Sequence, residues 1–176
     1  LRDGDCDMIM LGRPLLADPE WPNKAYAGKV GEIRPCIGCQ EGCINEFVDG
    51  GHPQCAVNPR TGFEELMPEA VAPAEVKKHI AVVGGGPAGV LFAIQAARRG
   101  HKVDLYEKTG RIGGKIVPGS VPRIKYDIHN YLLYLEHELK AAEKAYDLDV
   151  HMNTEVTAES LKSKKYDAVV YAIDVS

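Results

Sequence analysis

Four cysteines gathered in one short stretch are the residues of this sequence best suited to hold a metal centre. Cys36, Cys39 and Cys43 are separated by two and three residues, and Cys55 follows after eleven more. Cys6 stands apart. An odd number of cysteines in a chain whose first residues are charged, and unlike a signal peptide, does not indicate a disulfide framework. In a reducing cytosol such a cluster indicates metal ligation.

Two kinds of metal centre use four thiolates. Three thiolates on one tight loop and a fourth returning from a distance can surround a [4Fe–4S] cluster, which takes four cysteine ligands. Gly38 and Gly42 leave backbone N–H groups of this loop free to point at the sulfides. Structural zinc also takes four thiolates, but zinc ribbons usually carry two C-x2-C pairs and this sequence has one. We therefore predict a [4Fe–4S] cluster, with zinc as the alternative.

A glycine-rich loop forms the second chemical group. In the series Gly84-x-Gly86-x-x-Gly89, the first glycine permits a tight turn and the second lets backbone approach a pyrophosphate. The third lets the following helix, whose N-terminus attracts phosphate, pack against the strand. Glu107 ends the next strand, 18 residues after Gly89, where its carboxylate accepts hydrogen bonds from ribose hydroxyls. The pattern predicts dinucleotide binding; the alternative is a glycine turn without a ligand.

The residues after Glu107 bear on which dinucleotide is bound. The negative charge of Glu107 disfavours a 2′-phosphate, and therefore NADP, in this pocket. Gly113 and Gly114 follow the acid after a short gap. This combination resembles the ADP-binding half of FAD proteins of the glutathione-reductase type, whereas plain NAD sites need no second glycine pair. We predict FAD; the alternative for Gly113 and Gly114 is an ordinary loop.

The elements that must position the glycine loop form an α/β, Rossmann-like unit. A buried strand, a helix closed by Gly100 and a second strand make one β-α-β unit. A later segment repeats apolar residues at spacings of three and four, which predicts an amphipathic helix. The predicted elements are strands over 80–83, 102–107, 150–152 and 168–172 and helices over 90–99 and 128–142.

The first half of the sequence is less regular. Continuous apolar residues predict a buried strand over 5–12, covered on both faces. Pro14 is suited to starting a helical turn, and a short helix is predicted over 23–27. Glycines and prolines predict loop over 34–59, and prolines predict a connector over 60–78.

Composition limits the function classes. A chain of 176 residues with 45% hydrophobic residues has enough apolar surface for a core, and its formal charge of −4 argues against a nucleic-acid partner. No apolar run approaches the roughly 18 residues of a membrane span. We expect a cytoplasmic protein with no nucleic-acid or membrane partner, and a chain that is a fragment of a longer protein at both ends.

The motifs together, in this order, resemble the multidomain NADH:flavin oxidoreductases. This family includes 2,4-dienoyl-CoA reductase, 2-enoate reductase and trimethylamine dehydrogenase. The matching stretches span 7–19, 34–43, 55–59 and 82–89. The resemblance implies an FMN-bearing (β/α)8 barrel, a [4Fe–4S] cluster and a glutathione-reductase-like FAD region. It also implies electron flow from NAD(P)H through FAD, the cluster and FMN to a small unsaturated substrate.

The same resemblance implies cofactor contacts and domain boundaries. Gly12 and Arg13 correspond to FMN-phosphate contacts, and the four clustered cysteines to the iron ligands. The residues assigned to FAD are Gly84, Gly86, Ala88, Gly89, Glu107, Lys108, Gly114, Lys115, Lys125 and Val156. The implied parts are a barrel end (1–33), a cluster loop (34–59), a linker (60–78) and a partial FAD domain (79–176). The family's catalytic acid lies in barrel strands outside this sequence, so no catalytic residue is predicted.

Two other functions stay open at this point. One is an amine dehydrogenase like trimethylamine dehydrogenase, in which the nucleotide site holds structural ADP. The other is a non-catalytic FAD/iron–sulfur electron-transfer module. We expect no turnover from this chain alone, and we expect the apolar residues 8–11 to be exposed or paired with another chain, which favours self-association.

Overall fold

The computed structural model describes residues 3–68 and 70–173. The chain divides into two compact units, Leu1–Pro68 and Glu69–Ser176. The boundary between them falls inside the connector predicted over 60–78. The finer division into barrel end, cluster loop, linker and FAD domain stays a prediction.

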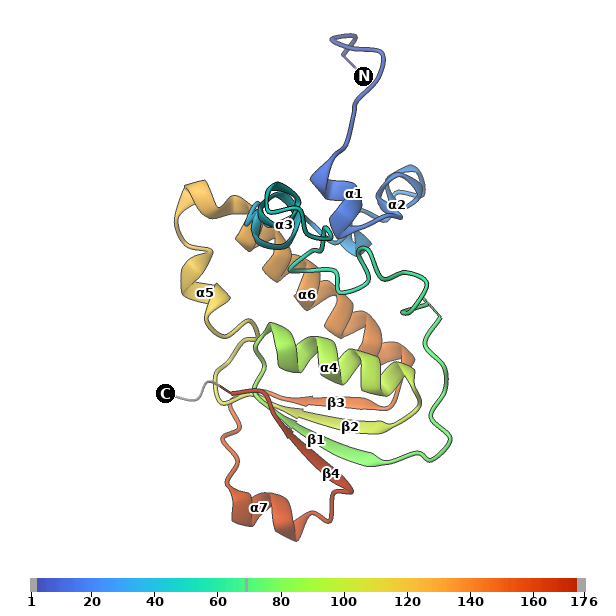
Figure 1. The fold of residues 1–176 in the computed structure, drawn as a ribbon. Helices are drawn as coiled ribbons and strands as arrows, with labels where there is room; N and C mark the ends of the chain where they lie inside the picture. The colour runs from blue at the N-terminus through green and yellow to red at the C-terminus, as the bar shows by residue number, and fades with distance from the viewer. Residues whose placement is uncertain (1–2, 69, 174–176) are drawn as a thin grey trace. The chain divides into compact units, whose positions relative to one another are not determined.

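The second unit is built on a parallel sheet of four strands in the order β3-β2-β1-β4 (Figure 1). The strands are His79–Val83 (β1), Lys102–Tyr106 (β2), Leu148–His151 (β3) and Ala168–Tyr171 (β4). All four were predicted, with ends that differ by one or two residues. Because β1 and β2 run in parallel, the glycine loop after Val83 and the acid after Tyr106 meet at one edge of the sheet.

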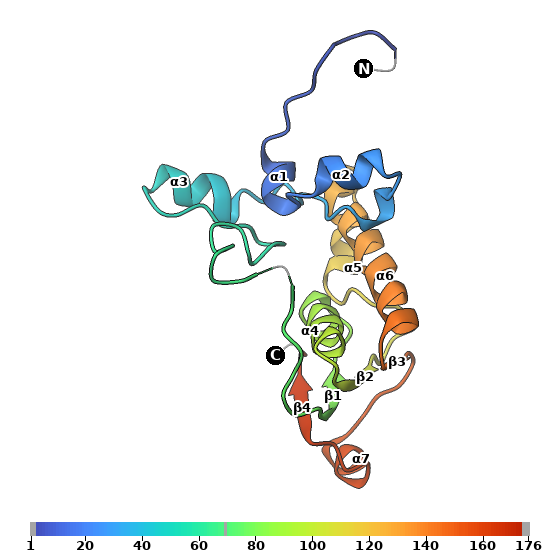
Figure 2. The same cartoon turned by 90° about the vertical axis from the view of Figure 1, so that its right-hand side faces the viewer.

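Helices α4 (Pro87–Arg98) and α6 (Tyr126–Ala145) cover one face of this sheet, and α7 (Ala158–Ser163) lies on the other, as Figure 1 and Figure 2 show. Both long helices were predicted; α4 begins and ends earlier than expected, and α6 is longer at both ends. Helix α4 begins at Pro87, because proline suits the first turn of a helix. Apolar side chains fill the space between sheet and helices: Ile80, Val82, Val90, Ile94, Val103, Leu105, Leu132, Leu135 and Leu139. The α/β fold class predicted from the sequence is therefore confirmed.

The opposite face of the sheet carries a polar cluster around Asp104. His79 Nε2 lies 2.8 Å and His151 Nε2 3.1 Å from its carboxylate oxygens, and the Tyr166 hydroxyl donates at 2.6 Å. Burial by itself raises the pKa of Asp104, but hydrogen bonds from Tyr166, His151 and His79 outweigh it and hold the pKa below its usual value. The pKa of Tyr166 is raised by burial and by its bond to Asp104. This face is thus tied together by charge-assisted hydrogen bonds.

The first unit consists of short helical segments joined by loops. Its helices are α1 (Arg13–Ala17), α2 (Trp21–Tyr26), the 3-10 turn η1 (Val30–Glu32), the π-helical turn η2 (Glu41–Asn45) and α3 (Glu46–Val48). The helices after Pro14 and near residues 23–27 were predicted. The loop-rich segment predicted over 34–59 also contains two short helical turns, η2 and α3. A left-handed Gln40, with φ of 61°, and a hydrogen bond from Gln54 N to Gly42 O fold this segment locally.

The buried strand predicted over 5–12 is not formed. This segment is exposed, with Met8 at 86% and Met10 at 97% of the accessibility of a fully exposed residue. A strand needs neighbours for its backbone hydrogen bonds, and no strand pairs with it within 3–68 or 70–173. This exposure agrees with the separate expectation that residues 8–11 are exposed or paired with another chain. Within the described ranges, no helix is long and apolar enough to cross a membrane.

Candidate functional site

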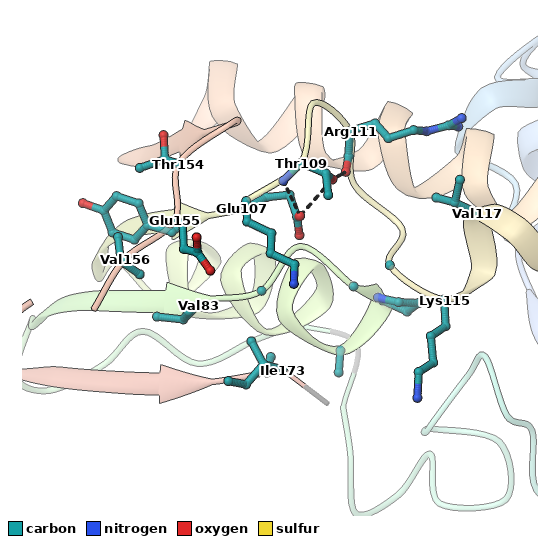
Figure 3. A pocket seen from close by; sticks show the side chains of 18 of the residues that line it. Val83, Glu107, Thr109, Arg111, Lys115, Val117, Thr154, Glu155, Val156 and Ile173 are labelled. Carbon is teal, nitrogen blue, oxygen red and sulfur yellow. Dashed lines mark hydrogen bonds between the residues drawn. The ribbon is translucent and has the colours of Figure 1, made fainter. Parts of the chain in front are cut away.

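A cleft of about 960 Å³ opens in the second unit where β1 and β2 end (Figure 3). It collects most of the residues predicted to contact FAD: Gly84, Gly86, Ala88, Glu107, Lys108, Gly114, Lys115 and Val156. Gly89 is buried beneath it in α4, and Lys125 does not line it. Gly12 and Arg13 belong to the first unit.

The three glycines of the first loop differ in what surrounds them. Gly84 has φ of +110°, and a Cβ there would lie 2.5 Å from the carbonyl oxygen of Ala172. A Cβ on Gly89 would collide with the carbonyl oxygen of Gly84, so α4 packs against the loop only with glycine here. A Cβ on Gly86 would meet no protein atom within 4 Å. The first and third glycines shape the turn, and the second leaves open space at the N-terminus of α4.

The second glycine pair packs directly on the first loop. Gly113 donates its N–H to the carbonyl oxygen of Gly85 at 2.7 Å. Gly113 and Gly114 both have positive φ, +113° and +51°, which glycine adopts at little cost. A Cβ on Gly114 would lie 3.3 Å from the Cα of Gly86. Gly114 therefore lines the cleft, and Gly113 ties this turn to the first glycine loop.

Glu107 is held in place by the glycine loop. Its side chain is 7% exposed, and Oε2 accepts the N–H of Gly85 at 2.7 Å. Oε1 accepts the backbone N–H of Thr109 at 2.8 Å and lies 2.9 Å from the Thr109 hydroxyl (Figure 3). The same hydroxyl lies 2.8 Å from the carbonyl oxygen of Arg111. A hydroxyl has one proton to donate, so the Thr109 hydroxyl can turn to Arg111, and the second acceptor position of Oε1 can then take another donor, such as a ribose hydroxyl.

Thr109 was not predicted, because a threonine in a turn carries no signal for a partner two residues before it. The remaining walls of the cleft are mixed. Glu155 joins Glu107 as a second carboxylate, and Val83, Val117, Val156 and Ile173 give apolar surface (Figure 3). Lys108, Arg111 and Lys115 supply positive charge, and Arg111 also pairs with Glu136 at 3.5 Å. The cleft therefore combines positive charge, apolar surface, open space at Gly86 and a carboxylate held in place. These features suit a nucleotide, so the cleft fits the ADP half of FAD.

The first unit brings the four predicted iron ligands to one small cavity. Cys36, Cys39, Cys43 and Cys55 all line it. The backbone N–H of Gly38 donates to Cys36 Sγ at 3.4 Å. A Cβ on Gly42 would lie 3.1 Å from the backbone of Gln54, so glycine permits the close approach that carries Cys55 to the other three. The sequence prediction that these thiols converge is met in this geometry.

Hydrogen bonds join the end of α1 to the segment before Cys36 and to the segment after Cys55. The carbonyl oxygen of Leu16 accepts the Asn58 side-chain amide at 2.9 Å and the Thr61 hydroxyl at 2.7 Å. Asp18 Oδ2 accepts the N–H of Arg34 at 2.8 Å and Lys24 Nζ at 2.7 Å. Asp18 and Asn58 are 4% and 3% exposed. Neither was singled out in the sequence, because an acid or amide before proline indicates only a turn.

Four thiolates are the ligand set of both a [4Fe–4S] cluster and structural zinc. Zinc holds its thiolates at about 2.3 Å, which brings all four sulfurs close together. Across 3–68 and 70–173, no three His, Cys, Asp or Glu side chains are grouped closely enough to hold a single metal ion. The four cysteines that line this cavity match in number the ligands that a [4Fe–4S] cluster takes. Arg13 lines the same cavity, and Gly12 precedes it as the N-cap of α1.

The sequence and the structure of this chain are similar to those of known flavoprotein oxidoreductases. A family model described as FAD dependent oxidoreductase matches residues 79–145. Cinnamate reductase of Clostridium sporogenes is 43% identical over 169 residues, 96% of this chain and 24% of that protein. NADH oxidase of Thermoanaerobacter brockii is 41% identical over 173 residues, 98% of this chain and 26% of that protein.

A solved structure resembles this one over almost the whole chain. The 2-naphthoyl-CoA reductase in complex with 2-naphthoyl-CoA has a TM-score of 0.89 and 34% identity, covering 97% of this chain and 25% of that one. The chain therefore spans about a quarter of the length of the relatives it matches.

Proposed function

Since the chain belongs to the flavoprotein oxidoreductase family of cinnamate reductase and 2-naphthoyl-CoA reductase, we propose that it is part of an NAD(P)H-dependent iron–sulfur flavoenzyme. The enzyme reduces an activated C=C bond in a small molecule such as an enoate or an enoyl thioester. The observation that carries the proposal is the four cysteines around one cavity in the same chain as an FAD-type cleft.

In this proposal the cleft binds the ADP half of FAD. Glu107, fixed by Gly85 and Thr109, accepts the ribose hydroxyls. Gly86 and the N-terminus of the twelve-residue helix α4 receive the pyrophosphate, where free N–H groups and the helix dipole favour negative charge. Val156, which lines the same cleft, would give FAD an apolar contact. Bound FAD would supply two-electron chemistry toward NAD(P)H and one-electron chemistry toward an iron–sulfur centre.

The four cysteines hold a [4Fe–4S] cluster in the proposal. Asp18, Asn58 and Thr61 join α1 to the two cysteine-bearing segments by hydrogen bonds. Gly12 and Arg13 bind the phosphate of FMN, as the family resemblance implies. The residues of this chain thus bind and orient the carriers, and the substrate is bound by parts of the protein outside it.

Reduction of a C=C bond is favoured over amine oxidation because cinnamate reductase and 2-naphthoyl-CoA reductase, two of the relatives described above, are reductases by name. We propose that the intact protein reduces cinnamate or an enoyl thioester with NADH under anaerobic conditions. NADH oxidation dependent on the unsaturated substrate is the measurement. Oxidation of dimethylamine with no enoate reduction would reverse this assignment in favour of the amine-dehydrogenase alternative.

The cofactor content of this chain tests the site directly. Anaerobic, iron-supplied preparations should be brown and contain about four iron atoms per chain. Cys55→Ala should lose the iron, while ADP binding to the second unit stays unchanged because the two sites lie in different units. Stoichiometric zinc in place of iron would refute the cluster. We expect no NADH-dependent reduction by the 176-residue chain alone, because hydride transfer needs donor and acceptor positioned together.

A further inference from the structure

The segment between β3 and α7 forms one wall of the nucleotide cleft without being helix or strand. Its residues Thr154, Glu155 and Val156 line the cleft. Figure 3 shows them on one side of Glu107, with Lys115 on the other side. An irregular wall keeps its shape through the contacts that its residues make with the rest of the fold. Those contacts therefore decide how firmly the cleft is shaped before a nucleotide binds.

The first part of this wall is bonded to the turn that carries Glu107. Asn153, in the left-handed conformation with φ of 52°, donates its N–H to the carbonyl oxygen of Thr109 at 2.9 Å. Thr154 donates its N–H to the carbonyl oxygen of Glu107 at 2.9 Å, and Glu107 donates its own N–H to the carbonyl oxygen of His151 at 3.0 Å. These three backbone bonds keep the wall and the acid turn side by side, so a shift in one moves the other.

The second part of the wall is held by packing on the sheet face that α7 covers. Val156 packs against a buried cluster of Ala81, Tyr106 and Leu161. Leu161 comes from α7, and the partly buried Tyr166 packs against the same cluster. The place of Val156 in the cleft thus depends on α7 and on the two tyrosine rings.

Hydrogen bonds lock these two tyrosine rings together. Lys164 Nζ donates to the hydroxyl oxygen of Tyr106 at 2.8 Å and lies 4.8 Å from the centre of its ring. The hydroxyl oxygens of Tyr106 and Tyr166 lie 2.6 Å apart, and Tyr166 donates to Asp104 Oδ2 at 2.6 Å. An ammonium can only donate and a carboxylate can only accept, so each hydroxyl in the chain points its proton toward Asp104. Opposite charges at the two ends make such a chain stronger than one between neutral groups.

The same carboxylate also holds the other flank of the wall. His151 Nε2 lies 3.1 Å from Asp104 Oδ1, and the His151 ring stacks on Tyr106 with ring centres 4.7 Å apart. The carbonyl oxygen of His151 is the one that accepts the N–H of Glu107. Asp104 thus anchors the residue before the wall through His151 and the residues after it through Tyr166, from the face of the sheet away from α4 and α6.

We propose that Tyr166 is a positioning residue for nucleotide binding. It joins the chain after α7 to Asp104 and so holds the Thr154–Val156 wall in the shape that receives the adenosine half of the nucleotide. The inference rests on the nucleotide site proposed above. Tyr166 lies outside the residues that line the cleft and acts through Tyr106 and Val156. A wall that is shaped in advance spares the nucleotide the cost of ordering it on binding.

The test is calorimetric titration of the 176-residue chain and its Tyr166→Phe variant with ADP. The substitution keeps the ring that packs beside Val156 and removes only the hydroxyl that joins Tyr106 to Asp104. ADP should bind roughly three- to tenfold more weakly, which corresponds to the loss of one hydrogen bond.

Two further measurements separate positioning from a general loss of structure. In the free Tyr166→Phe protein, the amides of Asn153 and Thr154 should exchange hydrogen faster, while those of β1 and α4 stay protected. Inorganic pyrophosphate, which in the proposed site occupies only the Gly86 end of the cleft, should bind the variant as it binds wild type.

Tyr146→Phe is the matched control. Tyr146 belongs to the same unit and lines a separate cavity with Lys78 and Lys102, where β1 and β2 begin. The control loses the same hydroxyl and should leave ADP affinity and the exchange at 153–154 unchanged. Equal ADP affinity in Tyr166→Phe and wild type overturns the proposal. A loss of pyrophosphate binding by the same factor as ADP binding also overturns it, because that loss is general and not confined to the wall.

Lys164 provides a second pair of variants should Tyr166→Phe fail to fold. Lys164→Met removes the donor at the start of the chain of hydrogen bonds and should weaken ADP binding, whereas Lys164→Arg retains a donor and should bind ADP as wild type does. Equal affinity in Lys164→Met and wild type sinks the proposal in that case. A wild-type chain that binds no ADP refutes the nucleotide site itself, and with it the role of Tyr166. A wild-type chain that binds ADP with an affinity indifferent to residues 164 and 166 refutes only the positioning.

Discussion

Replacing Glu107 with glutamine tests whether the anchored carboxylate is the ribose site. In the structure Glu107 accepts backbone N–H groups on both oxygens, from Gly85 at 2.7 Å and from Thr109 at 2.8 Å. A glutamine amide has one oxygen and one NH₂ group. In either orientation the NH₂ group faces one of these N–H donors, so one charge-assisted hydrogen bond is lost and a buried donor is left without an acceptor.

The lost hydrogen bond should lower both the thermal stability of the protein and its affinity for ADP. One hydrogen bond to a charged group contributes roughly 1.5–3 kcal/mol, which for a chain of this length lowers the melting temperature by about 3–12 °C. A ribose hydroxyl that loses the same acceptor costs the nucleotide a comparable amount. Since 1.4 kcal/mol is about tenfold in affinity, ADP should bind at least about tenfold more weakly. Thermal unfolding followed by circular dichroism and calorimetric titration with ADP give the two numbers.

Thr109→Val is the control for this experiment. It keeps the backbone N–H that Glu107 accepts and removes only the hydroxyl, which has a second acceptor in Arg111. We expect a loss of about 1 kcal/mol or less and little change in ADP affinity. A folded Glu107→Gln protein that binds ADP as tightly as wild type would show that the ribose lies elsewhere and that the carboxylate serves only the glycine loop.

Two further predictions follow from the second unit. Gly89→Ala should destabilise it by about 3 kcal/mol or more, since a Cβ there collides with the carbonyl oxygen of Gly84; Gly86→Ala should leave the urea midpoint nearly unchanged and weaken ADP binding, because its Cβ enters open space in the cleft. Equal urea midpoints for the two alanine variants would contradict this assignment. The pKa of Asp104 is lower in the folded protein than its unfolded value of 3.8, so the ionised carboxylate stabilises the fold at pH values above 3.8. This stabilisation is lost as the pH falls through the lower pKa of the folded protein. Asp104→Asn should therefore lose less stability than wild type between about pH 5 and pH 3, as measured by urea unfolding, and parallel losses would refute the role of the carboxylate.

The nucleotide cleft was largely predictable from sequence because its parts are local. All the features that predicted it lie within about thirty residues of sequence. They are a strand, three glycines at fixed spacing, a helix and an acid at the end of the next strand. Parallel pairing of β1 with β2 then places Gly85 beside Glu107. The packing of Gly113 on Gly85 was not predictable, because it joins two loops through backbone groups that carry no residue signature.

In the first unit, the contacts that hold the structure together join residues far apart in the sequence. The cysteine spacing alone predicted that four thiols converge, and the four cysteines line one cavity. What holds them together was decided by tertiary structure: Asn58 reaches the carbonyl oxygen of Leu16 across 42 positions of sequence, and Asp18 reaches Arg34 across 16. The strand predicted over 5–12 fails for the same physical reason. Helices satisfy their backbone hydrogen bonds locally, whereas strands and side-chain anchors depend on partners that only the folded chain provides.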